Sequence, residues 1–219
     1  MTLKEFIEKN RGRKVFLEHE VKELLKAAGF SVPKGIFIKK GGVFPESFDL
    51  NYPLIAKVSS SKISSKSDIG GIRAGIRDRH NLEDAVAHLQ QIGDAEGVLV
   101  EEMAPQGIEV IVGGIIDQQF GPVVMLGLGG IFVELFKDVV FGLAPLDREN
   151  ACWLIRQVKG YALLQGYRGS PPADIEALEE IIIHVSGMIA SGMLEEITLN
   201  PVALYPEGAV ILDAKMLTV

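Results

Sequence analysis

Apolar residues recur every three or four positions in several stretches of this 219-residue chain, which predicts amphipathic helices. The predicted helices are residues 18–28, a helix that an Asn81 cap begins, residues 148–159 and residues 174–189. Short apolar runs between glycine, proline or polar residues predict strands. The predicted strands are residues 36–38, 54–58, 98–103, 109–116, 120–126 and 132–136. The strands come in hairpins rather than in strict alternation with helices, so the pattern favours an α+β fold.

The last predicted hairpin, residues 195–215, places polar side chains on a strand pair. A Tyr205–Gly208 turn separates its two apolar runs. Side chains alternate along a strand, so one face of the first strand carries Glu196, Thr198 and Asn200. Asp213 lies in the returning apolar run, where a carboxylate is costly to bury without a partner. The oxygen atoms of Asn200 and Asp213 suit Mg²⁺ carried with a phosphate, and the alternative is a solvent-facing hairpin.

A second polar region follows the predicted strand 54–58. Residues 59–71 are rich in Ser, Lys and Gly without a hydrophobic period, which predicts a loop, and the basic stretch 73–79 is interpreted as solvated loop. Lys57 ends the strand just before this loop, where an ammonium can bind phosphate oxygens. Backbone N–H groups of residues 67–71 are expected to fold over the same phosphates. The alternative for Lys57 is a snorkelling surface lysine.

The break at Pro105 is the predicted hinge between a smaller and a larger lobe. We predict that residues 1–100 form an N-terminal helix and the smaller lobe, and that residues 101–219 form the larger lobe with the hairpin. The hinge strand carries Glu101, Glu102 and Met103, whose backbone can bond a base edge and whose methionine supplies an adaptable apolar wall. Glu109, on the next strand, is placed to accept hydrogen bonds from ribose hydroxyls.

Composition narrows the class of protein. A net charge of −7 argues against a general nucleic-acid binder, and the single cysteine, Cys152, forms no internal disulfide. The charged N-terminal segment and the absence of a long apolar stretch predict a cytoplasmic protein without a membrane partner. There is no P-loop motif and no His/Cys cluster at zinc spacing. The run Gly127–Gly130 leads into a predicted strand, so it is not a dinucleotide fingerprint.

The combination of lysine, glycine loop, hinge, acid and distant Asn/Asp pair resembles the ATP-grasp superfamily. The nearest likeness is the ATP-grasp (beta) subunit or domain of ADP-forming acyl-CoA synthetases, which include ADP-forming acetate–CoA ligase and are relatives of succinyl-CoA synthetase. The likeness extends from Glu20 to about Met216 and is most specific over residues 101–146. Further matching segments are Arg168-Gly169, Asn200-Pro201 and Asp213-Ala214-Lys215.

The resemblance implies an ATP-grasp fold, two α+β lobes that hold ATP or ADP with Mg²⁺ between them. It implies a catalytic set of Lys57, Lys66 and Asp68, nucleotide contacts from Lys57, Gly70, Gly71, Glu101, Glu102, Met103, Ala104 and Glu109, and metal ligands Asn200 and Asp213. The family also implies a hetero-oligomer with a CoA-binding alpha subunit, because a chain of this length leaves no room for a CoA-binding domain. In the family, a phosphohistidine carries the phosphoryl group to ADP.

Three positions depart from the family pattern. Ser65 stands where the family has the histidine of its His-Lys-Ser-Asp loop, Gly142 replaces an arginine, and Thr198 replaces an aspartate. Three hypotheses therefore remain open. The chain is the nucleotide-binding subunit of an ADP-forming acid–CoA ligase, a non-catalytic regulatory module without the relay histidine, or an ATP-dependent carboxylate–amine ligase.

Overall fold

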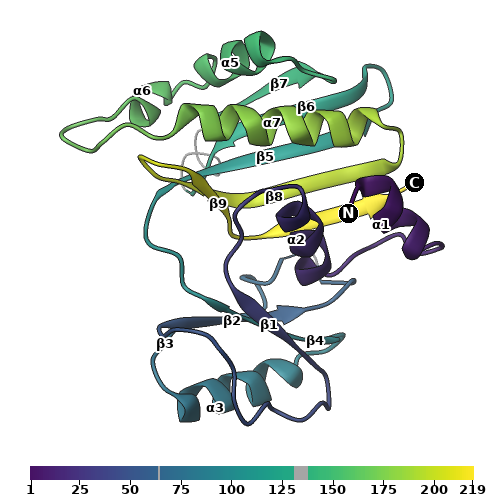
Figure 1. Cartoon of the computed structure of the whole chain (residues 1–219), viewed down its shortest axis with the longest axis vertical. Coiled ribbons are helices and arrows are strands. Elements are labelled where there is room, and N and C mark those ends of the chain that lie inside the picture. Colours follow the sequence, from purple (N-terminus) through teal and green to yellow (C-terminus); the bar gives the residue numbers. More distant parts are fainter. Residues whose placement is uncertain (64, 131–137) are drawn as a thin grey trace. The chain divides into compact units, whose positions relative to one another are not determined.

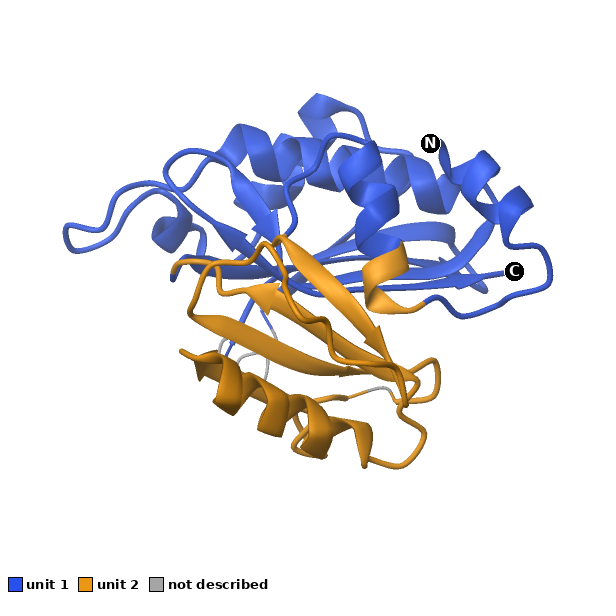
Figure 2. Cartoon of the chain, turned by 60° about the horizontal axis from the view of Figure 1, so that its bottom comes forward, with its two compact units in different colours: residues 1–16, 21–32, 106–219 blue, residues 17–20, 33–105 orange. Residues whose placement is uncertain are grey.

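The computed structural model describes residues 1–63, 65–130 and 138–219, which divide into two compact units (Figure 1, Figure 2). Unit 1 comprises residues 1–16, 21–32 and 106–219, and unit 2 comprises residues 17–20 and 33–105. Each unit contains an antiparallel sheet with at least one helix packed on it, which confirms the predicted α+β class. In the described part of the chain, no helix is both long enough and apolar enough to span a bilayer.

Unit 2 is a four-stranded sheet with one long helix. Its elements are β1 (Gly35–Lys39), β2 (Leu54–Ser59), β3 (Ile72–Ile76), α3 (Arg79–Gln90) and β4 (Gly97–Glu102). The strand order is β1-β4-β2-β3, so β2 and β4 are the two central strands. Leu82, Val86 and Leu89 of α3 are buried against residues of the central strands, as expected for an apolar stripe at helical spacing. This core lies on the face of the sheet that carries Ala56 and Val100, so Lys57 and Glu101 lie on the other face.

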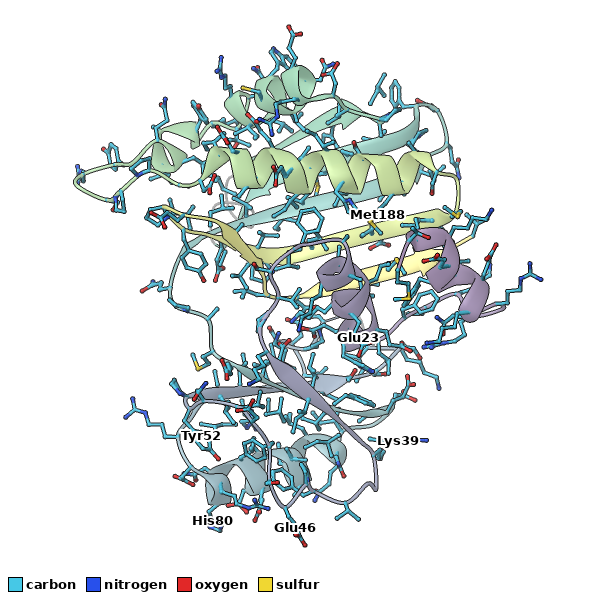
Figure 3. All side chains as sticks on the ribbon, viewed as in Figure 1. Glu23, Lys39, Glu46, Tyr52, His80 and Met188 are labelled. Carbon is cyan, nitrogen blue, oxygen red and sulfur yellow. The ribbon has the colours of Figure 1, made fainter. Side chains whose placement is uncertain are left out.

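Unit 1 is a larger sheet in the order β10-β8-β5-β6-β7, with β9 also paired to β8. Its elements are α1 (Leu3–Lys9), most of α2 (Glu18–Ala27), β5 (Ile108–Asp117), β6 (Gly121–Leu128), β7 (Val139–Leu143), α5 (Arg148–Arg156), α6 (Tyr161–Leu164), α7 (Ile175–Ala190), β8 (Leu194–Leu204), β9 (Ala209–Ile211) and β10 (Ala214–Thr218). Helix α7 lies across β5 and β6 (Figure 1). Met188 is a buried side chain on its sheet side (Figure 3).

Most of the predicted elements are confirmed, and three corrections follow from local chemistry. The cap of α3 is Asp78, whose carboxylate accepts the N–H of Asn81, rather than Asn81 itself. Part of the basic stretch 73–79 belongs to strand β3, because its backbone pairs with β2 although its side chains are mostly exposed. Helices α1 and α6 and strand β7 are additional to the predicted elements. The predicted strand 132–136 lies outside the described residues.

The N-terminal segment is grouped differently from the sequence-based division at residue 100. Phe6, Phe16, Leu24 and Leu25 are buried in the core of unit 1, so residues 1–16 and 21–32 belong to that unit. The periodicity of a short helix reveals its apolar face but does not reveal which sheet buries that face. The other boundary falls between Pro105 and Gln106, at the predicted hinge break.

Asp174 joins the start of α7 to the turn of the terminal hairpin. Its carboxylate accepts the N–H of Ala177 at 3.0 Å and that of Gly208 at 2.7 Å, and its own N–H donates to the Tyr205 carbonyl. The backbone N–H of Ala177, followed by that of Gly208, lowers the pKa of Asp174. The carboxylate therefore contributes stability above the ordinary aspartate pKa, and this contribution is lost as the pH falls through the lowered value.

Replacing Asp174 with alanine is expected to lower the free energy of unfolding by about 1–2 kcal/mol at neutral pH, because a helix cap and a second hydrogen bond are lost. Urea unfolding at pH 7 and pH 3 measures this. The difference between wild type and Asp174→Ala is expected to shrink in acid. Glu176→Ala, in the first turn of the same helix, is the matched control, and an equal loss in the control would argue against the capping role.

Candidate functional site

Four charged side chains form a buried network in unit 2. The Lys57 ammonium donates to Glu18 Oε1 at 2.9 Å and to Glu101 Oε2 at 2.8 Å, and the Lys66 ammonium donates to Glu18 Oε2 at 2.7 Å. The side chains of Glu18, Lys57 and Glu101 are 3%, 7% and 2% exposed, whereas that of Lys66 is 17% exposed. Within the described residues, these contacts join two cations and two anions, and Lys66 is the most accessible of the four.

Strand pairing explains why Lys57 meets Glu101. In the β2–β4 register Lys57 lies opposite Leu99 and Ile55 lies opposite Glu101. Lys57 and Glu101 are therefore diagonal neighbours on one face of the sheet, within reach of a long side chain. Glu18 comes from the first turn of α2, which is grouped with unit 2. The alternative of a snorkelling surface lysine does not describe Lys57, because its ammonium is buried between two carboxylates.

The glycine loop of residues 66–71 is a tight turn. The N–H of Gly70 donates to the Ser67 carbonyl and that of Gly71 to the Lys66 carbonyl, so both groups are used within the loop in this conformation. Gly70 has a φ of +65°, and a Cβ at Gly71 would lie 2.5 Å from a methyl carbon of Val58. The glycines are thus required by the turn itself, and the phosphate contacts expected from the backbone of residues 67–71 stay a prediction. Asp68 is exposed on the same turn.

Two backbone N–H groups at the end of the hinge strand β4 already donate hydrogen bonds within the protein. The N–H of Glu102 donates to the Lys34 carbonyl and that of Met103 to the Pro53 carbonyl. Met103 is exposed, and its sulfur accepts the N–H of Gly75. A base edge would therefore bond to carbonyl oxygens of this strand or at Ala104. Glu101 does not point to such an edge, because its carboxylate contacts Lys57.

Glu109 lies at the start of β5 beside a cavity in unit 1. The cavity has a volume of about 420 Å³ and is lined by Gln106, Gly107, Ile108, Glu109, Leu128, Gly129, Gly130, Leu163, Tyr167 and Ser170. Gly129 donates to the Glu109 carbonyl at 2.6 Å, and a Cβ there would lie 2.7 Å from Glu109 Cβ, so only glycine fits. Burial and the nearby Glu109 charge raise the pKa of Tyr205. The Glu109 side chain is exposed and available to hydroxyl groups of a ligand.

Asn200 and Asp213 lie side by side in the terminal hairpin. Leu199 pairs with Ala214, and the N–H of Asn200 donates to the Asp213 carbonyl at 3.1 Å. Asn200 is exposed and Asp213 is half-buried, while Ile197 and Leu199 are buried on the opposite face, as predicted. An amide oxygen and a carboxylate are hard ligands that suit Mg²⁺ completed by water and phosphate oxygens. Among the described residues, no three His, Cys, Asp or Glu side chains gather at metal distance.

Sequence reasoning misses two charged residues near these positions. The pattern predicts Glu18 only as the first residue of a helix, yet it binds both Lys57 and Lys66. Lys22, one turn along α2, is 3% exposed and donates to the Leu212 carbonyl, next to Asp213. Both residues flank the apolar stripe of α2, which begins with Val21. Charges beside a stripe are usually solvated, so the pattern alone carries no signal that these two are buried.

Known proteins match this chain over nearly its whole length. The model of the ATP-grasp domain matches residues 8–218. Subunit beta of acetate–CoA ligase [ADP-forming] I from Pyrococcus furiosus is 40% identical over 98% of this chain and 97% of its own length. Subunit beta of the second such ligase in that organism is 36% identical over 94% and 93%.

A solved structure agrees with these sequence matches. An acetyl-coenzyme A synthetase of Ca. Korarchaeum cryptofilum, solved with coenzyme A and Ca-AMPCP, superposes with a TM-score of 0.86 and 36% identity, covering 99% of this chain and 98% of that one. Its sheets and the sheets of this chain share the ATP-grasp fold that the sequence predicts. The chain therefore belongs to the ATP-grasp domain family.

Proposed function

We propose that this chain is the nucleotide-binding subunit of an ADP-forming acid–CoA ligase. In this proposal it binds ADP or ATP with Mg²⁺ and transfers a phosphoryl group, coupled to the interconversion of an acyl-CoA and its free acid. The observation that carries the proposal is the end-to-end match to a ligase beta subunit, at 40% identity over nearly the whole of both chains. These relatives are acid–CoA ligases, which does not favour an amine ligase or a purely regulatory module.

In this proposal, different residues contact the phosphates, the nucleoside and the metal ion. In unit 2, Lys57 and Lys66 neutralise nucleotide phosphates, with Asp68, Gly70 and Gly71 on the adjoining turn, and the backbone of the strand Glu101 to Ala104 meets the adenine. In unit 1, Glu109 accepts from the ribose, and Asn200 and Asp213 hold Mg²⁺. When bound, Mg²⁺ neutralises charge on the phosphates. The enzyme groups act mainly by positioning and electrostatics, because phosphoryl transfer requires little covalent chemistry from the protein.

The partner in this proposal is an alpha subunit that binds CoA, so the active enzyme is a hetero-oligomer. Two of the relatives are named as beta subunits. Acetate–CoA ligase [ADP-forming] II of Archaeoglobus fulgidus is 38% identical over 92% of this chain, but the match covers only 30% of that relative. That relative is therefore long enough to contain a CoA-binding part as well, which the proposal assigns to the partner of this chain.

The relay histidine comes from the partner in this proposal. One structure of the Korarchaeum synthetase holds Mg-AMPPCP with a phosphohistidine segment that points towards the nucleotide binding site. This chain has Ser65 before Lys66, and a serine hydroxyl does not form the labile N–P bond of a phosphohistidine. A terminal phosphate oxygen of ADP would attack the partner's phosphohistidine, so that the N–P bond breaks and an O–P bond forms.

The experiment has two stages. Calorimetry of the isolated chain with ADP is expected to show binding that strengthens when Mg²⁺ is added. The chain is then mixed with a candidate CoA-binding subunit, and ATP is measured from acetyl-CoA, ADP and phosphate. Binding without turnover over a panel of acyl-CoA substrates would support a subunit that has lost catalysis, with Ser65 in place of the family histidine. No binding of ADP or ATP in either condition would contradict the proposal.

A further inference from the structure

Glu101 is a buried carboxylate in contact with a lysine that the proposed function assigns to nucleotide phosphates. We infer that Glu101 is an internal competitor for phosphate: its carboxylate occupies the Lys57 ammonium, and nucleotide phosphates must displace it. This inference rests on the proposed function, in which Lys57 binds phosphate. It assigns Glu101 to the control of phosphate affinity rather than to recognition of the base.

The contact is built into the sheet. Glu101 and Lys57 lie on the paired central strands β4 and β2, as diagonal neighbours on one face. Their charged atoms are 2.8 Å apart, and the two side chains are 2% and 7% exposed. A buried ion pair between the central strands of a sheet keeps its geometry, unlike a surface pair whose side chains rotate freely. The carboxylate therefore remains at the ammonium whenever the sheet is folded and no anion replaces it.

The carboxylates around Lys57 make the binding of a further anion to its ammonium unfavourable. Lys57 bonds both Glu18 and Glu101, so a phosphate oxygen at its ammonium would lie beside two carboxylates. Little water reaches these groups, so repulsion between like charges is screened far less than at the surface. Phosphate is therefore expected to bind Lys57 most tightly when one of the two carboxylates moves away or loses its charge.

The lysine contacts of the two carboxylates indicate that Glu101, rather than Glu18, competes with phosphate for Lys57. Glu18 bridges Lys57 at 2.9 Å and Lys66 at 2.7 Å through its two oxygens, so it holds the two lysines together. Removing Glu18 would disturb both cations and give an ambiguous result. A change at Glu101 acts on Lys57 and leaves the Glu18–Lys66 contact in place.

Two roles of Glu101 predict changes of opposite sign in phosphate affinity when its charge is removed. If Glu101 serves only to hold the Lys57 side chain in position for phosphate, its neutralisation weakens phosphate binding. If it competes with phosphate, its neutralisation strengthens that binding. The adenosine part of the nucleotide carries no phosphate, so its affinity separates an effect on Lys57 from a general disturbance of the site.

The test compares wild type, Glu101→Gln and Glu83→Gln. Glu83 lies on α3 of the same unit, and its exposed carboxylate accepts from Arg79 at 2.7 Å, away from the residues assigned to the nucleotide. Dissociation constants for adenosine, AMP and Mg·ADP are measured by calorimetry. Glu101→Gln is expected to bind ADP about tenfold more tightly than wild type, because a like charge is removed. Adenosine affinity is expected to stay the same, and Glu83→Gln is expected to match wild type with ADP.

Equal or weaker ADP binding by Glu101→Gln would overturn the inference while leaving the proposed function intact. If neither wild type nor the variant binds any nucleotide, the proposed function fails and the inference falls with it. Thermal unfolding establishes that each variant is folded. If Glu101→Gln is not folded, Glu101→Asp withdraws the carboxylate from Lys57 by one methylene, and a smaller gain in ADP affinity is expected. No gain in that variant would equally overturn the inference.

Discussion

Lys57→Met is expected to lower the free energy of unfolding of unit 2 by about 3–5 kcal/mol, because it leaves Glu18 and Glu101 buried without their shared cation. Both carboxylates lie within 3 Å of the Lys57 ammonium and are almost completely shielded from water. A buried carboxylate that loses its partner retains the cost of leaving water and loses the attraction that offset it. Denaturant unfolding of wild type and variant measures this loss directly.

The same reasoning predicts a partial rescue. Lys57→Met combined with Glu101→Gln removes one of the unpaired carboxylates, so the double variant is expected to be more stable than Lys57→Met alone. The control is Lys62→Met, which breaks an exposed pair with Asp94 and is expected to change stability little. Wild-type stability in Lys57→Met would show that the network is not buried in solution and would remove the basis for the inference on Glu101.

The terminal hairpin can be predicted from sequence because its interactions are local. Alternation along the strand points Asn200 and Leu199 in opposite directions, and the Tyr205–Gly208 turn is closed by the N–H of Tyr205 donating to the Gly208 carbonyl. A short turn between two apolar runs leaves one pairing that buries both, so neighbouring residues follow from the pattern. The proximity of Asn200 and Asp213 therefore follows from the order of residues alone.

The lysine network can be predicted only in part. The end of an apolar strand before a glycine loop identifies Lys57, but its two partners come from a helix start and from another strand. Such contacts depend on sheet order and on the docking of α2, which hydrophobic periodicity does not encode. The glycine loop illustrates the same limit. Its composition indicates a tight turn correctly, but it does not indicate that the N–H groups of Gly70 and Gly71 bond within the loop.

Asp213→Ala is expected to remove most of the effect of Mg²⁺ on nucleotide binding and to lower the affinity for Mg·ADP by roughly a hundredfold, the upper end of the loss that follows when an outer-shell partner of a metal ligand is removed. The proposed ligand set is small, with one carboxylate and one amide from the hairpin, so the carboxylate supplies its formal negative charge. The backbone carbonyl of residue 213 still accepts the N–H of Asn200 in the variant, so the hairpin is expected to keep its pairing. The affinity for ADP in EDTA is expected to change little.

Calorimetry with ADP in the presence of Mg²⁺ and in EDTA separates the metal from the nucleotide. Glu207→Ala removes an exposed acid from the turn of the same hairpin and is expected to leave both values at the wild-type level. Asn200→Ala removes a neutral ligand and is expected to lower the Mg²⁺ effect less than Asp213→Ala does, because the carboxylate carries the charge. A full Mg²⁺ effect in Asp213→Ala would place the metal elsewhere, even if nucleotide binding itself is retained.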